Sequence, residues 1–214
     1  MSYFQTENLR TLALVGHGSC GKTTLIEAML YRSGMIPEPG TVERGNTMCD
    51  NDALEKEVGH SIRLAVAHID TAMPNLTPVR IHVLDTPGYP DYIGQDLSAL
   101  DAVKSVAAVI DATKGVDLFT QRMMDMAAER KLCRMIVVNK FDVPEANLEE
   151  LLAEMQAIWG PGVLPINLPT QNHAHVIDCF EREEGESDIM SVADVHRAFI
   201  ERIVEEDDEQ LERY

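Results

Sequence analysis

The sequence predicts an α/β fold in which a mostly parallel sheet is flanked by helices. Three observations support this prediction. Short apolar runs typical of buried strands recur up to residue 138, stretches with helical periodicity separate them, and loops rich in glycine or polar residues follow several of the runs. The length of 214 residues allows one sizeable domain and a smaller second one.

The first strand and the first helix have clear patterns. Residues 11–15 form a continuous apolar run, as buried parallel strands do. Residues 22–33 have helical periodicity and are followed by Gly34, a common residue at helix ends. Residues 35–60 contain several prolines and glycines and predict a long irregular segment, which in a compact domain is usually functional. The inward face of the predicted helix consists of Leu25, Ile26, Met29 and Leu30.

Strands and helices continue to alternate after this segment. Residues 61–69 predict a strand, because Ile62, Leu64 and Val66 alternate with Arg63, Ala65 and Ala67. Pro74–Asn75 predicts a turn. The elements expected next are a strand at 79–84, a short helix near 91–103, a strand at 105–110, a helix across 117–131 and a buried strand from Cys133 to Val138.

The composition changes after Gly160, which predicts a core domain at 1–160 and a second, partial domain at 161–214. A capping pair, Asn147 and Glu150, begins the last helix of the core. Beyond Gly160, weaker patterns predict strands at 163–168 and 175–179. Ser191 and Asp194 predict the start of a final acidic helix. The inward face expected for this helix consists of Val195, Phe199, Ile203 and Val204.

Charge and cysteine usage restrict the classes of partner. The net charge of −18 argues against direct DNA binding through broad electrostatic attraction. No apolar run approaches the roughly 20 residues of a membrane span, and the start of the chain lacks the pattern of a secretory signal. Four cysteines without pairing or metal-type spacing fit a reducing cytoplasm. The acidic region 171–214 is interpreted as a solvated helical face or as a docking surface for a basic partner.

A phosphate-binding loop follows the first strand and precedes the first helix. Its glycines let successive backbone N–H groups converge on phosphate oxygens, and the helix N-terminus adds a favourable dipole. Lys22 is expected to reach the outer phosphates, and the Thr23 hydroxyl is expected to ligate Mg²⁺. This loop predicts a P-loop NTPase. Its expected nucleotide-binding residues are Gly16, His17, Gly18, Ser19, Cys20, Gly21, Lys22, Thr23 and Thr24.

Two further loops complete a guanine-nucleotide site. Asp85, Thr86, Pro87 and Gly88 follow a predicted strand, where a carboxylate can hold Mg²⁺ and Gly88 can bring its N–H to a terminal phosphate. Asn139, Lys140 and Asp142 follow another. Asp142 can accept hydrogen bonds from the N1–H and the exocyclic amine of guanine, a donor pair that adenine lacks. The Lys140 stem can lie over the base, and Asn139 can brace the phosphate loop. GTP and GDP are therefore the expected ligands.

These motifs resemble those of the elongation factor G family. The resemblance rests on the phosphate loop with Thr24 and Leu25, on Glu57–Ile62, and on Leu84–Tyr92; it is strong over residues 8–160 and weaker beyond. It implies GTP hydrolysis on the ribosome in translocation or recycling, with contact to the ribosomal stalk protein through the region 171–214. Leu164–Pro169 and Val176–Asp178 resemble the start of an inserted α+β subdomain. The family's later Ser–Ala guanine motif is not found after Asp142, so a fragment of a longer factor is expected.

The resemblance also defines departures near the catalytic centre. Tyr89 stands where the family has the histidine that positions water, Ser61 replaces a metal-ligating threonine, Gly18 replaces a branched apolar residue and Ser19 an aspartate. The implied catalytic residues are Tyr89, Gly88 and Lys22, and the implied metal ligands are Thr23, Ser61 and Asp85. These departures predict very slow intrinsic hydrolysis. The alternatives are a GTP-binding, poorly hydrolysing paralogue, a release or ribosomal protection factor, and, more distantly, a P-loop kinase or ATPase.

Cys20, in the phosphate loop, is interpreted as a small packing residue in preference to a redox switch. His173 and His175 have no further ligand cluster nearby in the sequence, so a zinc site is not expected there.

Overall fold

The computed structural model describes residues 4–49, 53–71 and 77–205. The chain divides into two compact units, Met1–Asn139 and Lys140–Tyr214. The functional division at residue 160 stays a prediction. The turn expected at Pro74–Asn75 lies outside the described residues, as does the end of the acidic region at 206–214.

The first unit is built on a five-stranded sheet with the order β2-β3-β1-β4-β5. Strands β1, β3, β4 and β5 run parallel, and only β2 is antiparallel to its neighbour, which confirms the predicted mostly parallel sheet. The register pairs Leu14 with Asp85 and Asp111 with Asn139, so the carboxyl ends of the parallel strands share one edge. The strands are β1 Leu9–Val15, β2 Ala65–Thr71, β3 Val79–Asp85, β4 Ser105–Asp111 and β5 Cys133–Asn139.

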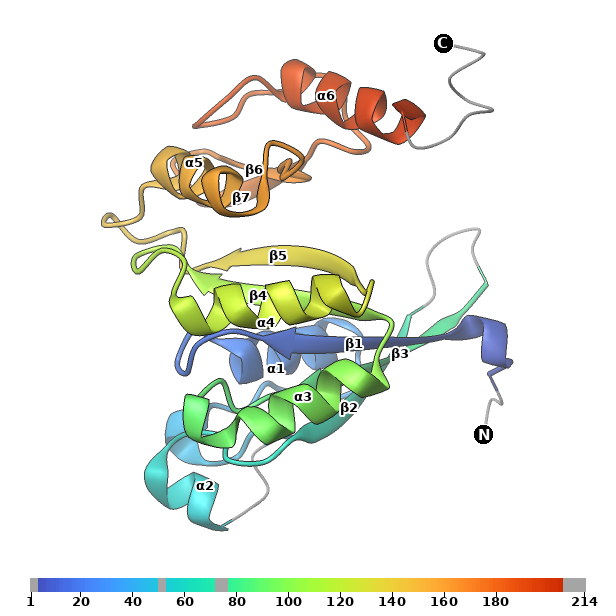
Figure 1. Ribbon diagram of the computed structural model, residues 1–214, viewed down its shortest axis with the longest axis vertical. Coiled ribbons are helices and arrows are strands. Elements are labelled where there is room, and N and C mark those ends of the chain that lie inside the picture. The colour runs from blue at the N-terminus through green and yellow to red at the C-terminus, as the bar shows by residue number, and fades with distance from the viewer. Residues whose placement is uncertain (1–3, 50–52, 72–76, 206–214) are drawn as a thin grey trace. The chain divides into compact units, whose positions relative to one another are not determined.

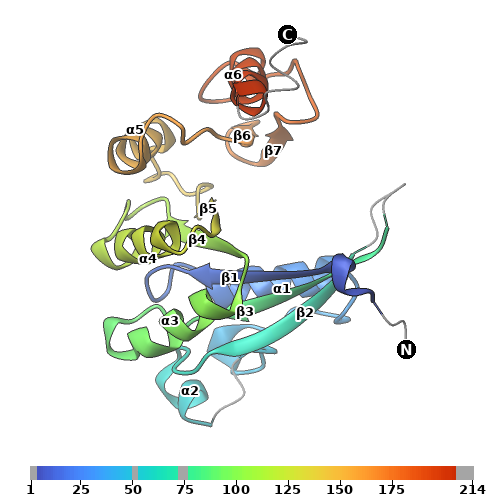
Figure 2. The same ribbon diagram turned by 45° about the vertical axis from the view of Figure 1, so that its right-hand side comes forward.

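Helices cover both faces of this sheet. Helix α1 (Lys22–Arg32) lies on one face, and α3 (Ile93–Ala102) and α4 (Leu118–Glu129) lie on the other (Figures 1 and 2). The Asp117 side chain accepts a hydrogen bond from the Thr120 N–H and caps α4. All three helices were predicted within a few residues. The core on the α1 side includes Leu14, Ile26, Leu30, Val83 and Val109.

The segment after α1 differs from its prediction in two ways. Residues 35–60 are not wholly irregular, because they contain a 3₁₀ turn at Val42–Arg44 and a short helix, α2 (Ala53–Val58). Six residues are too few to establish a helical period in the sequence. Strand β2 begins at Ala65, four residues later than expected, and Val66 is 62% exposed while Ile69 is buried.

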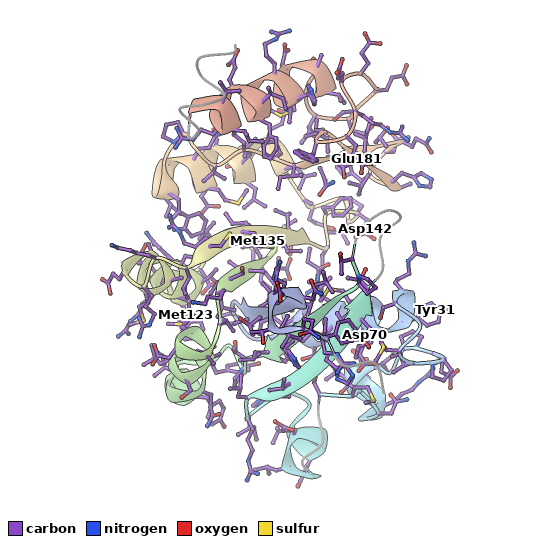
Figure 3. All side chains as sticks on the ribbon, turned by 90° about the vertical axis from the view of Figure 1, so that its right-hand side faces the viewer. Tyr31, Asp70, Met123, Met135, Asp142 and Glu181 are labelled. Atoms are coloured by element: carbon purple, nitrogen blue, oxygen red, sulfur yellow. The ribbon has the colours of Figure 1, made fainter. Side chains whose placement is uncertain are left out.

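The prediction that Cys133–Val138 would be a buried strand is wrong. The strand forms, but Cys133 is exposed and Met135 is 42% exposed, in contrast with the fully buried Met123 of α4. Figure 3 labels both methionines. Among the strands that the structure describes, β5 pairs only with β4 and is an edge of the sheet. An apolar run alone does not tell a central strand from an edge strand.

The second unit combines two helices with a two-stranded antiparallel sheet. Its elements are α5 Leu148–Trp159, β6 Asn167–Thr170, β7 His175–Asp178 and α6 Val192–Glu205. The predicted caps are confirmed, since Asn147 Oδ1 accepts from the Glu150 N–H at 3.2 Å and Ser191 Oγ from the Asp194 N–H at 3.3 Å. The core consists of Leu168, Ile177, Cys179, Val192 and Val195.

Two details of the second unit were predicted wrongly. Strand β6 lies at 167–170, later than the expected 163–168. Ile203, expected on the inward face of α6, is 42% exposed, whereas Val192, at the start of the helix, is buried. No helix among residues 4–49, 53–71 and 77–205 has the length and apolarity to cross a bilayer.

Candidate nucleotide-binding site

The phosphate loop connects β1 to α1 and encloses the Lys22 ammonium group. Lys22 is buried, and its Nζ donates hydrogen bonds to Gly16 O at 2.8 Å and to His17 O at 3.0 Å. Two glycines are sterically required. A Cβ atom added to Gly16 would lie 2.4 Å from Val109 O, and one added to Gly21 would lie 2.2 Å from Asn139 Nδ2. Both also have positive φ angles, which suit glycine.

Three side-chain oxygens meet beside the start of α1. Thr23 Oγ1 donates to Asp85 Oδ2 at 2.6 Å and lies 3.3 Å from Ser61 Oγ. The set joins the first turn of α1, the end of β3 and the segment before β2. Hydroxyl and carboxylate oxygens are the ligands that Mg²⁺ prefers, so the donor set fits this ion.

The loop after β3 lies directly against the phosphate loop. The Gly18 N–H donates to Gly88 O at 2.8 Å. A Cβ atom added to Gly88 would lie 2.2 Å from Gly16 O and 2.3 Å from Lys22 Nζ, and the φ angle of Gly88 is 78°. No side chain fits at this position. Thr86 anchors the loop by donating from its hydroxyl to Leu14 O at 2.9 Å.

The ring of Tyr89 lies directly over Gly18. A Cβ atom added to Gly18 would lie 2.1 Å from Tyr89 Cζ and 2.4 Å from its Oη. The ring also contacts two imidazoles, with centroid distances of 4.7 Å to His60 and 6.0 Å to His17. Two of the departures noted in the sequence, Gly18 and Tyr89, are therefore in direct contact.

Asn139 braces the phosphate loop as expected, because its Nδ2 donates to Cys20 O at 2.9 Å. Its own carbonyl accepts from the Ala112 N–H at 2.9 Å and fixes the end of β5. Lys140 has a φ angle of 57°, so the chain turns directly after the strand. Asp142, labelled in Figure 3, is exposed and belongs to the second unit, as Lys140 does.

The remaining site residues are either buried in the loops or exposed at their surface. Gly18 and Pro87 are buried, whereas His17, Ser19 and Thr24 are exposed. Burial raises the pKa of the Cys20 thiol, which favours the packing role over a reactive thiolate. Among the described residues, no group of three His, Cys, Asp or Glu side chains could hold a metal ion.

Two buried glutamates that the sequence analysis missed anchor the segment between α1 and β2. Glu27 is almost fully buried and accepts hydrogen bonds from the N–H groups of Gly40, at 2.8 Å, and Met48. Glu55 Oε1 accepts from the N–H groups of Ile62 at 2.9 Å and Arg63 at 3.0 Å. Both carboxylates thus fix the backbone on either side of Ser61. Sequence periodicity could not find them, because their partners are backbone groups of an irregular segment.

Asp96, on α3, is a third buried acid that the sequence analysis missed. Its side chain is fully buried, and neither carboxylate oxygen has a hydrogen-bond partner among the described residues. The nearby Thr86 hydroxyl is committed to Leu14 O. Burial raises the pKa of Asp96, and the Thr86 hydroxyl, the Lys22 charge and nearby backbone N–H groups oppose this effect only in part.

Comparisons with known proteins agree with this geometry. The model of the elongation factor Tu GTP binding domain matches residues 7–210. An elongation factor G-like protein of Mycobacterium tuberculosis is 33% identical over 96% of this chain and 30% of its own length. Peptide chain release factor 3 of Streptococcus pyogenes is 32% identical over 75% of this chain and 31% of its own length.

A crystal structure of a Thermus thermophilus protein superposes with a TM-score of 0.83 at 33% identity, covering 96% of this chain and 32% of the other. The chain thus spans about a third of the length of these relatives. The matched family model covers both the phosphate loop and the residues from Asn139 to Asp142. The chain therefore belongs to the translational GTPases, the family defined by the GTP-binding domain of elongation factor Tu.

Proposed function

We propose that this chain binds GTP and GDP with Mg²⁺ and hydrolyses GTP as part of a factor similar to elongation factor G. The observation that carries the proposal is the convergence of Lys22, Thr23, Ser61 and Asp85 on one phosphate loop. The hydrogen bond from Asn139 Nδ2 to Cys20 O connects the end of β5 to the same loop. The names of the similar proteins, an elongation factor G-like protein and a peptide chain release factor, support a role in translation. We infer that this role is on the ribosome, in translocation or recycling, and that it takes place in the cytoplasm.

Each loop has a separate task in binding GTP. The backbone N–H groups of the phosphate loop hold the phosphates, and Lys22 exchanges its two carbonyl partners for phosphate oxygens. Gly88 offers its N–H to the terminal phosphate. Thr23, Ser61 and Asp85 would hold Mg²⁺, which neutralises the charge that develops on the phosphates. Asp142 accepts two hydrogen bonds from the guanine edge.

The buried glutamates couple the terminal phosphate to a larger segment. Glu27 and Glu55 hold backbone groups on either side of Ser61. Ser61 would be one of the residues that hold Mg²⁺, and it lies in a segment that these two carboxylates already anchor. A change of contacts at Ser61 after loss of the terminal phosphate would therefore be passed to the whole segment, which is the kind of switch that GTPases use.

A second candidate function is a GTP-binding, poorly hydrolysing paralogue or ribosomal protection factor. Tyr89 favours this second function, because it places a phenol where the elongation factor G family has the imidazole that positions water. The ring of Tyr89 also contacts Gly18, the second departure from that family. The acidic region 171–214 is proposed as the contact with the ribosomal stalk protein in either case.

Calorimetric titration tests the nucleotide specificity. The wild-type chain is expected to bind GDP and GTP at least about 100-fold more tightly than ADP, because adenine leaves the Asp142 carboxylate without donors. Asp142→Asn is expected to lose GDP affinity and gain affinity for xanthosine diphosphate, whose second ring carbonyl accepts from the new amide. Exposed Asp188→Asn in the same unit is the matched control. Equal affinity for GDP and ADP would overturn the proposal.

Phosphate release in the presence of ribosomes separates the two functions. A hydrolysing factor is expected to release phosphate faster when ribosomes are added. A rate that ribosomes leave unchanged would support the poorly hydrolysing paralogue.

A further inference from the structure

Four aromatic rings lie close to one another beside the phosphate loop. This ring cluster consists of His17, His60, Tyr89 and Tyr92. The closest pair is His60 and Tyr89, with centroids 4.7 Å apart and planes tilted by 46°. His17 lies 6.0 Å from Tyr89, and Tyr92 lies 6.5 Å from His60. The cluster thus joins the phosphate loop, the segment before β2 and the segment after Gly88.

His60 is the member nearest in sequence to the oxygen set for Mg²⁺. It directly precedes Ser61, whose Oγ lies 3.3 Å from Thr23 Oγ1. The His60 side chain is half-buried, so its ring is partly shielded while water can still reach it. Glu55 holds the next two backbone N–H groups after Ser61, which fixes the course of the chain at this point.

The hydrogen bond of His60 determines which of its ring nitrogens can accept a hydrogen bond. His60 Nδ1 lies 3.3 Å from Ser61 O. A carbonyl oxygen only accepts, so Nδ1 carries the hydrogen of this bond. In the neutral ring Nε2 is then an acceptor, and it makes no hydrogen bond with any residue in the described part of the chain. Nε2 can therefore accept a hydrogen from water.

Tyr89 restricts the position of this imidazole. Its ring is held on one side by Gly18, where a single added methyl group would overlap it, and it contacts His60 at 4.7 Å. The Gly18 N–H donates to Gly88 O, so the phosphate loop and the loop that carries Tyr89 are bonded to each other next to this ring. The Tyr89 ring therefore has a defined position, and the His60 ring packs against it.

We propose that His60 is a catalytic residue of GTP hydrolysis and that it orients the attacking water through Nε2, while Tyr89 positions the imidazole. This inference rests on the proposed function. In the reaction, the water oxygen bonds to the γ-phosphorus, and the bond from that phosphorus to the bridging oxygen breaks with its electron pair left on GDP. The proton lost by the water passes to a γ-phosphate oxygen, which gives dihydrogen phosphate. His60 keeps its own protonation state throughout.

Single-turnover hydrolysis of GTP labelled at the γ-phosphate tests the inference, with the chain in excess over GTP and Mg²⁺ present. His60→Ala is expected to lower the hydrolysis rate at least about 10-fold, because the water loses its orientation, while the Kd for GTP changes less than about twofold. His60→Gln is expected to recover most of the rate, since its amide oxygen is also an acceptor. His68→Ala is the matched control, because His68 is exposed on β2 and forms a similar tilted pair with His82 at 6.4 Å.

Three results would overturn the inference. One is a His60→Ala rate within twofold of wild type. Another is a slower hydrolysis rate in His60→Ala that is explained by an equal loss of GTP affinity, or a slower rate that His60→Gln shares. The third is a wild-type chain that binds GTP but does not hydrolyse it. That result would be consistent with the proposed GTP binding and would exclude a catalytic role for His60. Failure to bind GTP at all would instead overturn the proposed function, and the inference with it.

Discussion

The contact between Gly18 and Tyr89 makes a quantitative prediction. In Gly18→Ala the new Cβ atom would lie 2.1 Å from Tyr89 Cζ, which is 1.3 Å less than the 3.4 Å at which ordinary contact begins. The Gly18 backbone has no positive φ angle, so the substitution introduces no backbone strain. The substitution must therefore displace the Tyr89 ring. We expect this to lower the unfolding free energy of Gly18→Ala by about 1–2 kcal/mol, as at other overpacked sites.

A double-mutant cycle separates this contact from other effects. In a Tyr89→Ala background the overlap no longer exists, and Gly18→Ala should stabilise the chain by about 0.5 kcal/mol by restricting the unfolded state. The change of sign between the two backgrounds is the specific result expected. Urea unfolding of the four variants without nucleotide, followed by circular dichroism, measures it. An equal effect of Gly18→Ala in both backgrounds would refute the contact as the origin of the cost.

Three further predictions concern other parts of the site. Because burial raises the pKa of Asp96, the native chain keeps this proton while the unfolded chain releases it, so stability falls as pH rises from about 4 through the native pKa. Asp96→Asn should therefore raise the unfolding free energy by about 1–3 kcal/mol at pH 7 and not at pH 4, and a pH-independent gain in urea unfolding would contradict this reasoning. Asn139→Ala should weaken GDP binding about 10-fold in calorimetry, because Cys20 O loses its donor; unchanged affinity would show that the brace is dispensable. Thr23→Val should make GDP affinity nearly the same with Mg²⁺ and with a chelator, whereas an undiminished Mg²⁺ dependence would exclude the Thr23 hydroxyl as a ligand.

The fold was predictable where one pattern dominates a segment. The run at 11–15 and the periodicity at 22–33 correspond to β1 and α1 within a few residues. The capping pair Asn147 and Glu150 marks the start of α5 correctly because it is a local interaction. Such segments are specified by neighbours in sequence, which a single sequence contains.

The errors have a common physical origin in non-local contacts. The apolar run of β5 gave no indication that its outer side would lack a strand partner in the described sheet. Val66 was grouped with the larger apolar residues, yet the smaller Ala65 and Ala67 share the inner face with Ile69. Periodicity cannot say which face of a short strand is covered.

In the candidate site, too, the features set by local sequence were predictable and those set by non-local contacts were not. The order and spacing of the three loops were enough to predict that Lys22, Thr23 and Asp85 meet, because the ends of parallel strands share an edge. The roles of His60 and of the buried acids were not predictable. They depend on contacts with residues that are distant in the chain or on backbone groups, and no motif records them.

The most direct test of the central claim is a crystal structure of this chain with GDP and Mg²⁺. We expect the phosphates in the loop from Gly16 to Thr23, with Lys22 Nζ moved from its carbonyl partners to a phosphate oxygen. The guanine edge should lie on the Asp142 carboxylate of the same chain. A nucleotide whose phosphates occupy the loop while its base lies away from Asp142 would contradict the account.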